Sequence, residues 1–232
     1  MNQAAIQNFS YLFDNAIKQA HDRGDPEWRR QQREMAFSYF LEVGFPDVKQ
    51  EEWKYTNVMP IMEKEFVLPK IERIPDISEL LGKRWNDAIE FVFVDGVLSM
   101  EHSTTTTKQG IEVILFRDAM LNGDGALLRS RIEACLFDNS SAFPLLNQAF
   151  GEDGVWVKIA NDAVIEEHVH FIFISTIPNV LLSPCVIIDA GHSSQASLVQ
   201  SHIGSPGVGS FTSAVTDIHV AENANLTYCK VQ

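Results

Sequence analysis

The sequence predicts an α+β protein in which a helical N-terminal part precedes a part made of strands. Two observations support this prediction. Near the start of the chain, apolar residues recur every three or four positions, which places them on one face of a helix. After Gly151 this spacing disappears, and short β-rich runs alternate with turn residues. We therefore divide the chain into an N-terminal helical domain with a small β-element, residues 1–150, and a strand domain, residues 151–232.

The first segment of the chain predicts two helices joined by a short turn. The expected buried face of the first helix comprises Ile6, Phe9, Phe13, Ala16, Ile17 and Ala20. The second helix would start at Asp25-Pro26-Glu27, with Asp25 as the N-cap and Pro26 in the first turn. It would end at Gly44, because glycine readily takes the left-handed conformation after a helix. Its expected buried residues are Trp28, Met35, Ala36, Tyr39, Phe40 and Val43.

A β-hairpin is expected in the middle of the chain. Asp95-Gly96 is a dipeptide that favours tight turns, and it separates two β-rich runs at 89–94 and 97–100. The other expected elements here are a short helix at 78–85, a strand at 111–116, a helix at 117–136 weakened by two glycines, and a short helix or turn at 143–150.

The strand domain carries a weak internal repeat. Its expected strands are 155–159, 169–175, 186–189, 196–202, 211–220 and 224–231. Three turn-then-strand units place Ala163, Ala196 and Ala224 at intervals of 33 and 28 residues, two positions before an aliphatic residue. Stacked coils of a solenoid would give such a repeat. An antiparallel sandwich also gives regularly spaced strands, so periodicity alone leaves both architectures open.

Composition excludes several classes of partner. The formal charge of −13 disfavours nucleic acid, because phosphate binding requires a basic face. No apolar run is long enough to span a membrane, and the first residues lack the pattern of a signal peptide. Three scattered cysteines fit a reducing compartment better than a disulfide framework. We therefore expect a cytoplasmic protein with no nucleic-acid or membrane partner.

Candidate catalytic and metal-binding residues were weighed against simpler roles. His168 and His170 would share one face of a strand, and a metal would need His192, His202 or His219 as a third ligand. The sequence does not fix that ligand, so we interpret the pair as polar residues of a solvated face.

The other candidates also have simpler explanations. Cys229 alternates into the expected core, and the neighbouring acids Glu166-Glu167 and Glu51-Glu52 point to opposite faces. The glycine-rich stretch 204–210 does not lead into a helix, as phosphate loops do. We predict no catalytic, cofactor-binding or metal-binding residue.

The segment 44–56 is unusually rich in large residues for a connector. We expect Trp53 and Tyr55 to anchor it onto the core, because exposed aromatic rings of this size gain little. With the preceding helices, this Glu51-Glu52-Trp53-Lys54-Tyr55-Thr56 signature resembles the start of the SufB/SufD family of iron–sulfur cluster assembly proteins, and it favours the SufD branch. Phe91-Val92-Phe93-Val94-Asp95-Gly96 and Leu146-Asn147-Gln148-Ala149-Phe150 are similar to further family motifs, as are the segments 186–204 and 211–232.

The resemblance implies a fold and a role. The implied fold is an N-terminal helical domain followed by a right-handed parallel β-helix, of which 151–232 would form the first coils. The implied role is a non-catalytic subunit of the SufBCD scaffold, supporting cluster assembly and iron acquisition with SufB and the ATPase SufC. The cluster and ATP would belong to the complex, and no matching position carries a family site residue into this chain.

Because family members continue for further coils, we expect this chain to correspond to their N-terminal half and to present a truncated coil end. Such an end would favour a homodimer or end-to-end association. A β-helix enzyme acting on polysaccharide and a nonfunctional fragment are the alternatives.

Overall fold

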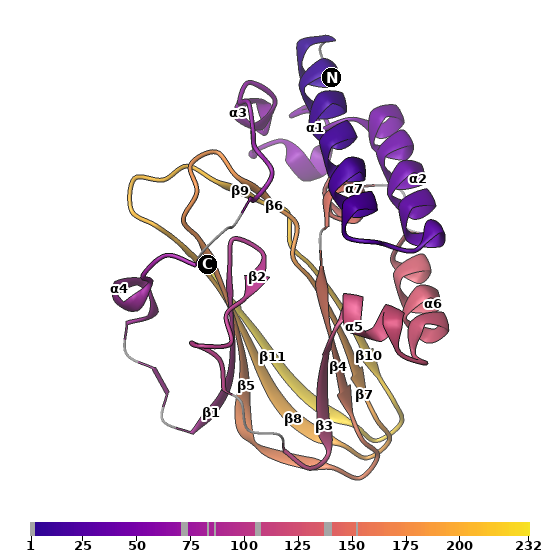
Figure 1. Cartoon of the computed structure of the whole chain (residues 1–232), viewed down its shortest axis with the longest axis vertical. Coiled ribbons are helices and arrows are strands. Elements are labelled where there is room, and N and C mark those ends of the chain that lie inside the picture. The colour runs from indigo at the N-terminus through magenta and orange to yellow at the C-terminus, as the bar shows by residue number, and fades with distance from the viewer. Residues whose placement is uncertain are drawn as a thin grey trace.

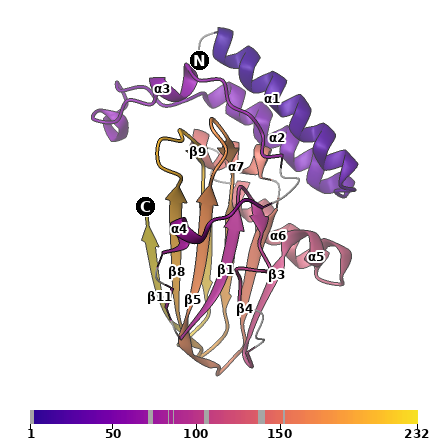
Figure 2. The same ribbon diagram turned by 60° about the vertical axis from the view of Figure 1, so that its left-hand side comes forward.

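Helices gather at one end of the molecule and strands extend away from them in the computed structural model (Figure 1). The structure describes residues 3–70, 74–82, 84–85, 87–104, 108–136, 141–151 and 153–232. The two long helices lie across the end of the strands, and α5 and α6 flank one side (Figure 2). The helices are α1 (Gln3–Asp22), α2 (Glu27–Val43), α3 (Met59–Met62), α4 (Ser78–Leu81), α5 (Phe116–Leu121), α6 (Gly125–Leu136) and α7 (Ala142–Phe150), with a 3-10 turn η1 (Glu51–Trp53).

Three sheets contain the described strands. The first has the order β11-β8-β5-β1-β2, the second β10-β7-β4-β3, and the third pairs β6 with β9. The strands are β1 (Ala88–Val94), β2 (Val97–Leu98), β3 (Ile111–Leu115), β4 (Gly154–Ile159), β5 (Val164–Ser175), β6 (Leu181–Leu182), β7 (Cys185–Ala190), β8 (Gln195–Gly204), β9 (Phe211–Thr212), β10 (Val215–Val220) and β11 (Asn225–Val231). The expected strand at 211–220 is therefore two strands, and the expected hairpin around Asp95-Gly96 is confirmed by β1 and β2.

Aromatic packing holds the helical end together. Phe9 of α1 contacts Phe40 of α2 edge to face, with ring centroids 5.6 Å apart. Phe13 stacks on Phe37 at 4.1 Å, and Phe150 of α7 closes the cluster against both. Rings arranged in this way gain interaction energy beyond the apolar area that they bury. This cluster fixes α1 and α2 over α7, which leads directly into β4.

The face that α2 buries differs from the expected one. Met35 and Val43 are 50% and 45% exposed, whereas Arg29, Gln32 and Arg33 are buried beside Ala36, Phe37 and Phe40. The expectation counted only apolar residues, and here polar side chains occupy much of the buried stripe. The N-cap prediction was also wrong. Pro26 holds the cap position without a side-chain hydrogen bond, because the Asp25 carboxylate pairs with arginines instead.

All described strand pairs within residues 153–232 are parallel and in register. One row of the second sheet runs Val157, Ile188, Ile218, so the chain returns to the same position after 31 and then 30 residues. A parallel pair needs a long crossover between its strands, which here is the rest of each repeat. This pairing contradicts the antiparallel sandwich, one of the two architectures left open by the sequence.

Strands from before residue 150 extend the same sheets. Seven residues of β1 pair in parallel with β5, from Ala88 opposite His168 to Val94 opposite Ile174. β3 pairs with β4 in the antiparallel direction. The helical part is thus joined to the strand part through backbone pairing as well as through packing.

The corners of successive repeats are equivalent, but the expected alignment of the alanines was wrong. Val164, Gln195 and Asn225 share one row, so Ala163 corresponds to Ser194 and Ala224, whereas Ala196 pairs with Leu226. The feature that repeats is backbone conformation. Asp162, Ser193 and Asn223 have φ of 58°, 55° and 59°, a left-handed conformation that few side chains tolerate.

This conformation makes Ser193 a test of the corner. Ser193→Val should lower the free energy of unfolding by about 1–3 kcal/mol, because a β-branched residue is strained at positive φ. Ser193→Gly should stay within about 1 kcal/mol of the wild type, because glycine accepts this conformation. Urea unfolding followed by circular dichroism measures both, and equal losses for the two variants would contradict the assignment.

Candidate functional site

A polar network begins inside the sheets at β8. The inward-facing row that holds Phe91 in β1 and Phe171 in β5 continues as Gln200 in β8. Gln200 is fully buried, and its Oε1 accepts hydrogen bonds from the Tyr228 hydroxyl at 2.8 Å and the Thr216 hydroxyl at 2.9 Å. A buried amide costs little when its hydrogen bonds are made. The interior therefore changes from aromatic to polar along successive repeats.

His202 belongs to the same network and lines its edge. It continues the row of Phe93 and Phe173, stacks on the Phe173 ring at 5.2 Å, and lies 2.9 Å from the Gln200 amide nitrogen through Nε2. Burial lowers the pKa of His202 from 6.5 to about 4, and Lys230 nearby adds to the effect. The imidazole is therefore neutral at pH 7 and serves as a hydrogen-bonding ring.

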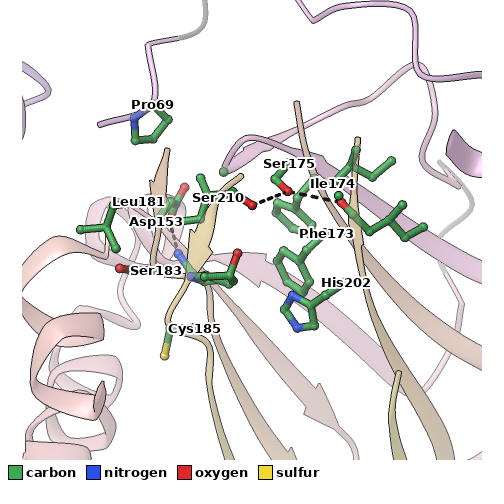
Figure 3. Close-up of a pocket in the computed structure, with 18 of the residues that line it drawn as sticks. Pro69, Asp153, Phe173, Ile174, Ser175, Leu181, Ser183, Cys185, His202 and Ser210 are labelled. Carbon is green, nitrogen blue, oxygen red and sulfur yellow. Dashed lines mark hydrogen bonds between the residues drawn. The ribbon is translucent and has the colours of Figure 1, made fainter. Parts of the chain in front are cut away.

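A cavity of about 320 Å³ lies beside this row (Figure 3). Phe93, Phe173 and His202 form one wall, and Ser175 hydrogen-bonds to Ser210 at 3.1 Å at another point of the lining. The hydroxyl of Ser183, a buried residue, also lines the cavity and has no described hydrogen-bond partner. This mixture suits an uncharged occupant better than an ion.

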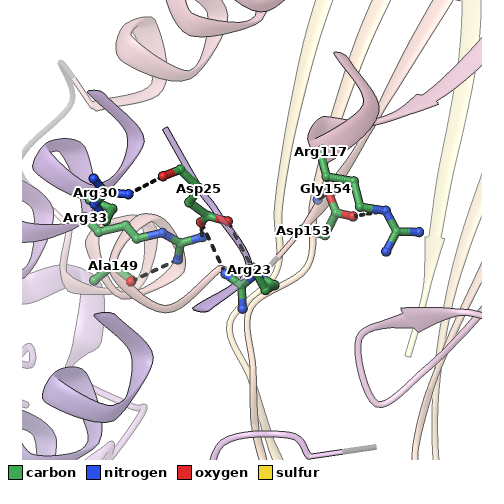
Figure 4. Close-up of polar contacts among 8 residues, drawn as sticks. All are labelled: Arg23, Asp25, Arg30, Arg33, Arg117, Ala149, Asp153 and Gly154. Carbon is green, nitrogen blue, oxygen red and sulfur yellow. Dashed lines mark hydrogen bonds and ion pairs between the residues drawn. The ribbon is translucent and has the colours of Figure 1, made fainter. Parts of the chain in front are cut away.

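Buried arginines stabilise the junction between α2 and α7 (Figure 4). Arg33 pairs with Asp25 at 3.2 Å and donates to the Ala149 carbonyl at 3.4 Å, while Arg23 reaches the same carboxylate at 3.2 Å. Arg29 donates to Gln148 at 3.2 Å. Burial, aided by the charge of Arg29, lowers the pKa of Arg33 to about 9. Asp25 is thus the carboxylate that two arginines share.

A second carboxylate lies at the start of β4. Asp153 accepts hydrogen bonds from the backbone of Gly154 and Arg117 and lies 3.5 Å from the Arg117 guanidinium (Figure 4). Burial raises its pKa nonetheless. This contact fixes α5 against the first strand of the repeat.

The five histidines considered as metal ligands do not converge. His168 and His170 both contact the Trp85 ring from β5, but His192 lies at an exposed corner and His202 faces the interior. His219 pairs with Asp217 at 2.8 Å on another sheet. Among the residues that the structure describes, no group of three or more His, Cys, Asp or Glu side chains could hold a metal ion.

The remaining sequence candidates have individual outcomes. Cys229 is exposed, which contradicts its expected place in the core, whereas Cys185 is buried and burial raises the pKa of its thiol to about 12. Trp53 packs on Phe143 at 5.2 Å as expected of an anchor. Tyr55 does not, because its side chain is 91% exposed and its described ring contact is Lys54. The stretch 204–210 connects β8 to β9.

Sequence reasoning missed the residues that the interior brings together. Gln200, Thr216 and Tyr228 are far apart in the chain and belong to no motif. A correct register would have placed Gln200 in the row of Phe91 and Phe171, and a polar residue in an aromatic row is an available signal. The alignment by alanines hid it, because it shifted the repeat by two residues.

Asp25 gives a test of the buried arginine cluster. Asp25→Asn should lower the free energy of unfolding at pH 7 by about 3–5 kcal/mol, because it leaves buried guanidinium groups without their carboxylate. Asp22→Asn is the matched control, since the Asp22 side chain is 67% exposed. Urea denaturation measures both, and a loss for Asp25→Asn no larger than for the control would contradict the role of this cluster.

His202 gives a test by pH. Its folded pKa of about 4 lies below the unfolded value of 6.5, so the unfolded state binds the proton first. Wild-type stability should therefore fall between pH 6.5 and pH 4, by about 1–2 kcal/mol from this partly exposed group. His202→Phe should lack this fall, although it loses some stability at pH 7 by leaving the Gln200 amide unpaired.

The measurement is urea unfolding at half-unit pH intervals. His192→Gln, at an exposed corner, is the control and should keep the wild-type slope. Parallel curves for wild type and His202→Phe would show that this imidazole does not set the slope.

Comparison with known proteins gives two matches. The family model described as the SufBD protein N-terminal region matches residues 3–79. The iron-sulfur cluster assembly protein SufD of Escherichia coli (strain K12) is 25% identical over 237 residues, covering 94% of this chain and 50% of that protein. The chain thus spans about half the length of this relative. Within the described residues, no helix is long and apolar enough to cross a membrane.

Proposed function

This chain is a protein of the SufB/SufD family, and we propose that it acts as a non-catalytic subunit in the assembly of iron–sulfur clusters. The observation that carries the proposal is the similarity to SufD along 94% of the chain, which extends well beyond the N-terminal region matched by the family model. A scaffold role also fits a site made of structural hydrogen bonds. The iron–sulfur cluster and ATP would then belong to the complex, and the chain itself would bind neither.

We propose that the strand part forms coils of a right-handed parallel β-helix. The support is the register: β4, β7 and β10 form one ladder, β5, β8 and β11 a second, and β6 and β9 a third. Each repeat visits the three sheets in the same order after about 30 residues, as stacked coils do. The corner residues Asp162, Ser193 and Asn223 share their conformation and not an acidic side chain, which gives a polysaccharide enzyme no repeated acid to use.

SufB and SufC are the partners that family membership favours, with iron acquisition as the associated task and the cytoplasm as the compartment. β10 and β11 are edge strands of their sheets, and edge strands present unpaired backbone groups. A partner that supplies a parallel strand could cover these edges. A second copy of the chain is the other candidate, which would give a homodimer.

The experiment is anaerobic co-purification of the tagged chain with co-expressed SufB and SufC, followed by native mass determination. We expect SufB to be recovered with the chain, and a tagged unrelated protein of similar charge serves as the control. Failure to recover either partner, even from a fusion that adds the C-terminal half of Escherichia coli SufD, would overturn the proposal. Recovery by the fusion alone would place the partner contacts outside this chain and contradict the role of its edges.

A further inference from the structure

Three polar side chains from consecutive strands meet on the outer face of the first sheet. Glu90 of β1 pairs with His170 of β5, and His170 pairs with Val199 of β8. Ser201 lies two residues beyond Val199, and side chains two apart in a strand share a face. Parallel register therefore brings Glu90, His170 and Ser201 to one side, opposite the interior row of Phe171 and Gln200.

The distances order these groups as a relay. The Ser201 hydroxyl lies 2.8 Å from His170 Nε2. His170 Nδ1 lies 3.6 Å from Glu90 Oε1 and has no closer hydrogen-bond partner. The side chains of Glu90 and His170 are 4% and 11% exposed, while Ser201 is half-buried and so retains access to solvent. A nucleophile, a base and an orienting carboxylate need this order, and such contacts are often loose without substrate.

The electrostatics favour the tautomer that the relay requires. A carboxylate facing Nδ1 stabilises a proton on that nitrogen, which leaves the Nε2 lone pair to accept the serine O–H. Burial lowers the pKa of His170 in spite of Glu90, so the imidazole is a neutral base at pH 7. The ring is also held in place, because the Trp85 indole stacks on it at 4.8 Å and 23°. Arg84 pairs with the other oxygen of Glu90.

The surroundings of Ser201 indicate the kind of substrate. Val199 and Ile203 lie two residues before and after it on the same face of β8, and both are half-buried. These apolar neighbours suit a short uncharged acyl group better than a charged one.

We propose that Ser201 is a nucleophile towards activated acyl esters, with His170 as its base and Glu90 as the positioning residue. Ser201 Oγ forms a bond to the ester carbonyl carbon while its proton passes to His170 Nε2. The bond from that carbon to the alcohol oxygen then breaks, and the alcohol leaves with the proton from His170. Water, deprotonated by the same nitrogen, hydrolyses the acyl-serine and restores the hydroxyl.

The first test uses covalent capture on the purified chain alone, so its outcome is independent of partner binding. The probe is an alkyl fluorophosphonate, which phosphorylates serine nucleophiles with loss of fluoride, and peptide mass spectrometry locates the adduct. We expect the adduct on Ser201 and its loss in Ser201→Ala. Ser197→Ala is the matched control, because Ser197 lies on the same face of β8 opposite His168. Labelling of Ser201 no faster than that of Ser197 would overturn the proposal.

The second test separates base and positioning roles, using p-nitrophenyl butyrate and a stopped-flow burst. His170→Gln should reduce the burst rate at least tenfold. Glu90→Gln should change its pH profile, and Glu90→Asp should partly restore it, whereas a purely structural role would leave the profile unmoved. Absence of any burst in the wild-type chain would contradict the proposal even if these variants failed to fold.

Discussion

Parallel in-register pairing between strands about 30 residues apart is the constraint on which the rest of this structure depends. Once Val157, Ile188 and Ile218 share a row, every other side chain of these strands is assigned to the interior or the outer face. Rows such as Phe93, Phe173 and His202 then stack at the strand spacing of about 4.8 Å. The polar interior and the outer cluster at His170 both follow from this one alignment.

The helical end serves the strands by satisfying their corners. Asn147 of α7 is buried, and its amide donates to the Pro184 carbonyl at 2.8 Å and the Ser213 carbonyl at 2.6 Å. One side chain thus holds two successive repeats at the same level. Asp95 does the same for the hairpin, because its carboxylate accepts from the backbone N–H groups of Thr176 at 2.7 Å and Ile177 at 3.3 Å. Family-like motifs in the sequence coincide with these two residues, and their chemistry here is structural.

The sequence was a good guide wherever local physics decides the outcome. The extents of α1 and α2, the Asp95-Gly96 turn and most strands of the second part follow from periodicity and turn chemistry. The buried face of α2 did not follow, because Arg29 and Arg33 are acceptable inside only through partners from α7 and the preceding turn. The polar network around Gln200 needed the register, which the repeated alanines misaligned. Exposed Tyr55 shows that an aromatic signature can exist without packing.

The pairing of β1 with β5 has a consequence for how the chain acquires its structure. Ala88 waits for His168, 80 residues later, before its strand gains a neighbour on that side. Contacts at such separation close large loops and slow the search for the native state. During synthesis, β1 emerges long before its partner and exposes Phe91 and Val92 in the meantime. The helical end can form early, but the sheet that joins it to the coils is completed only after the first coil has left the ribosome, which makes this step the one most open to aggregation or chaperone binding.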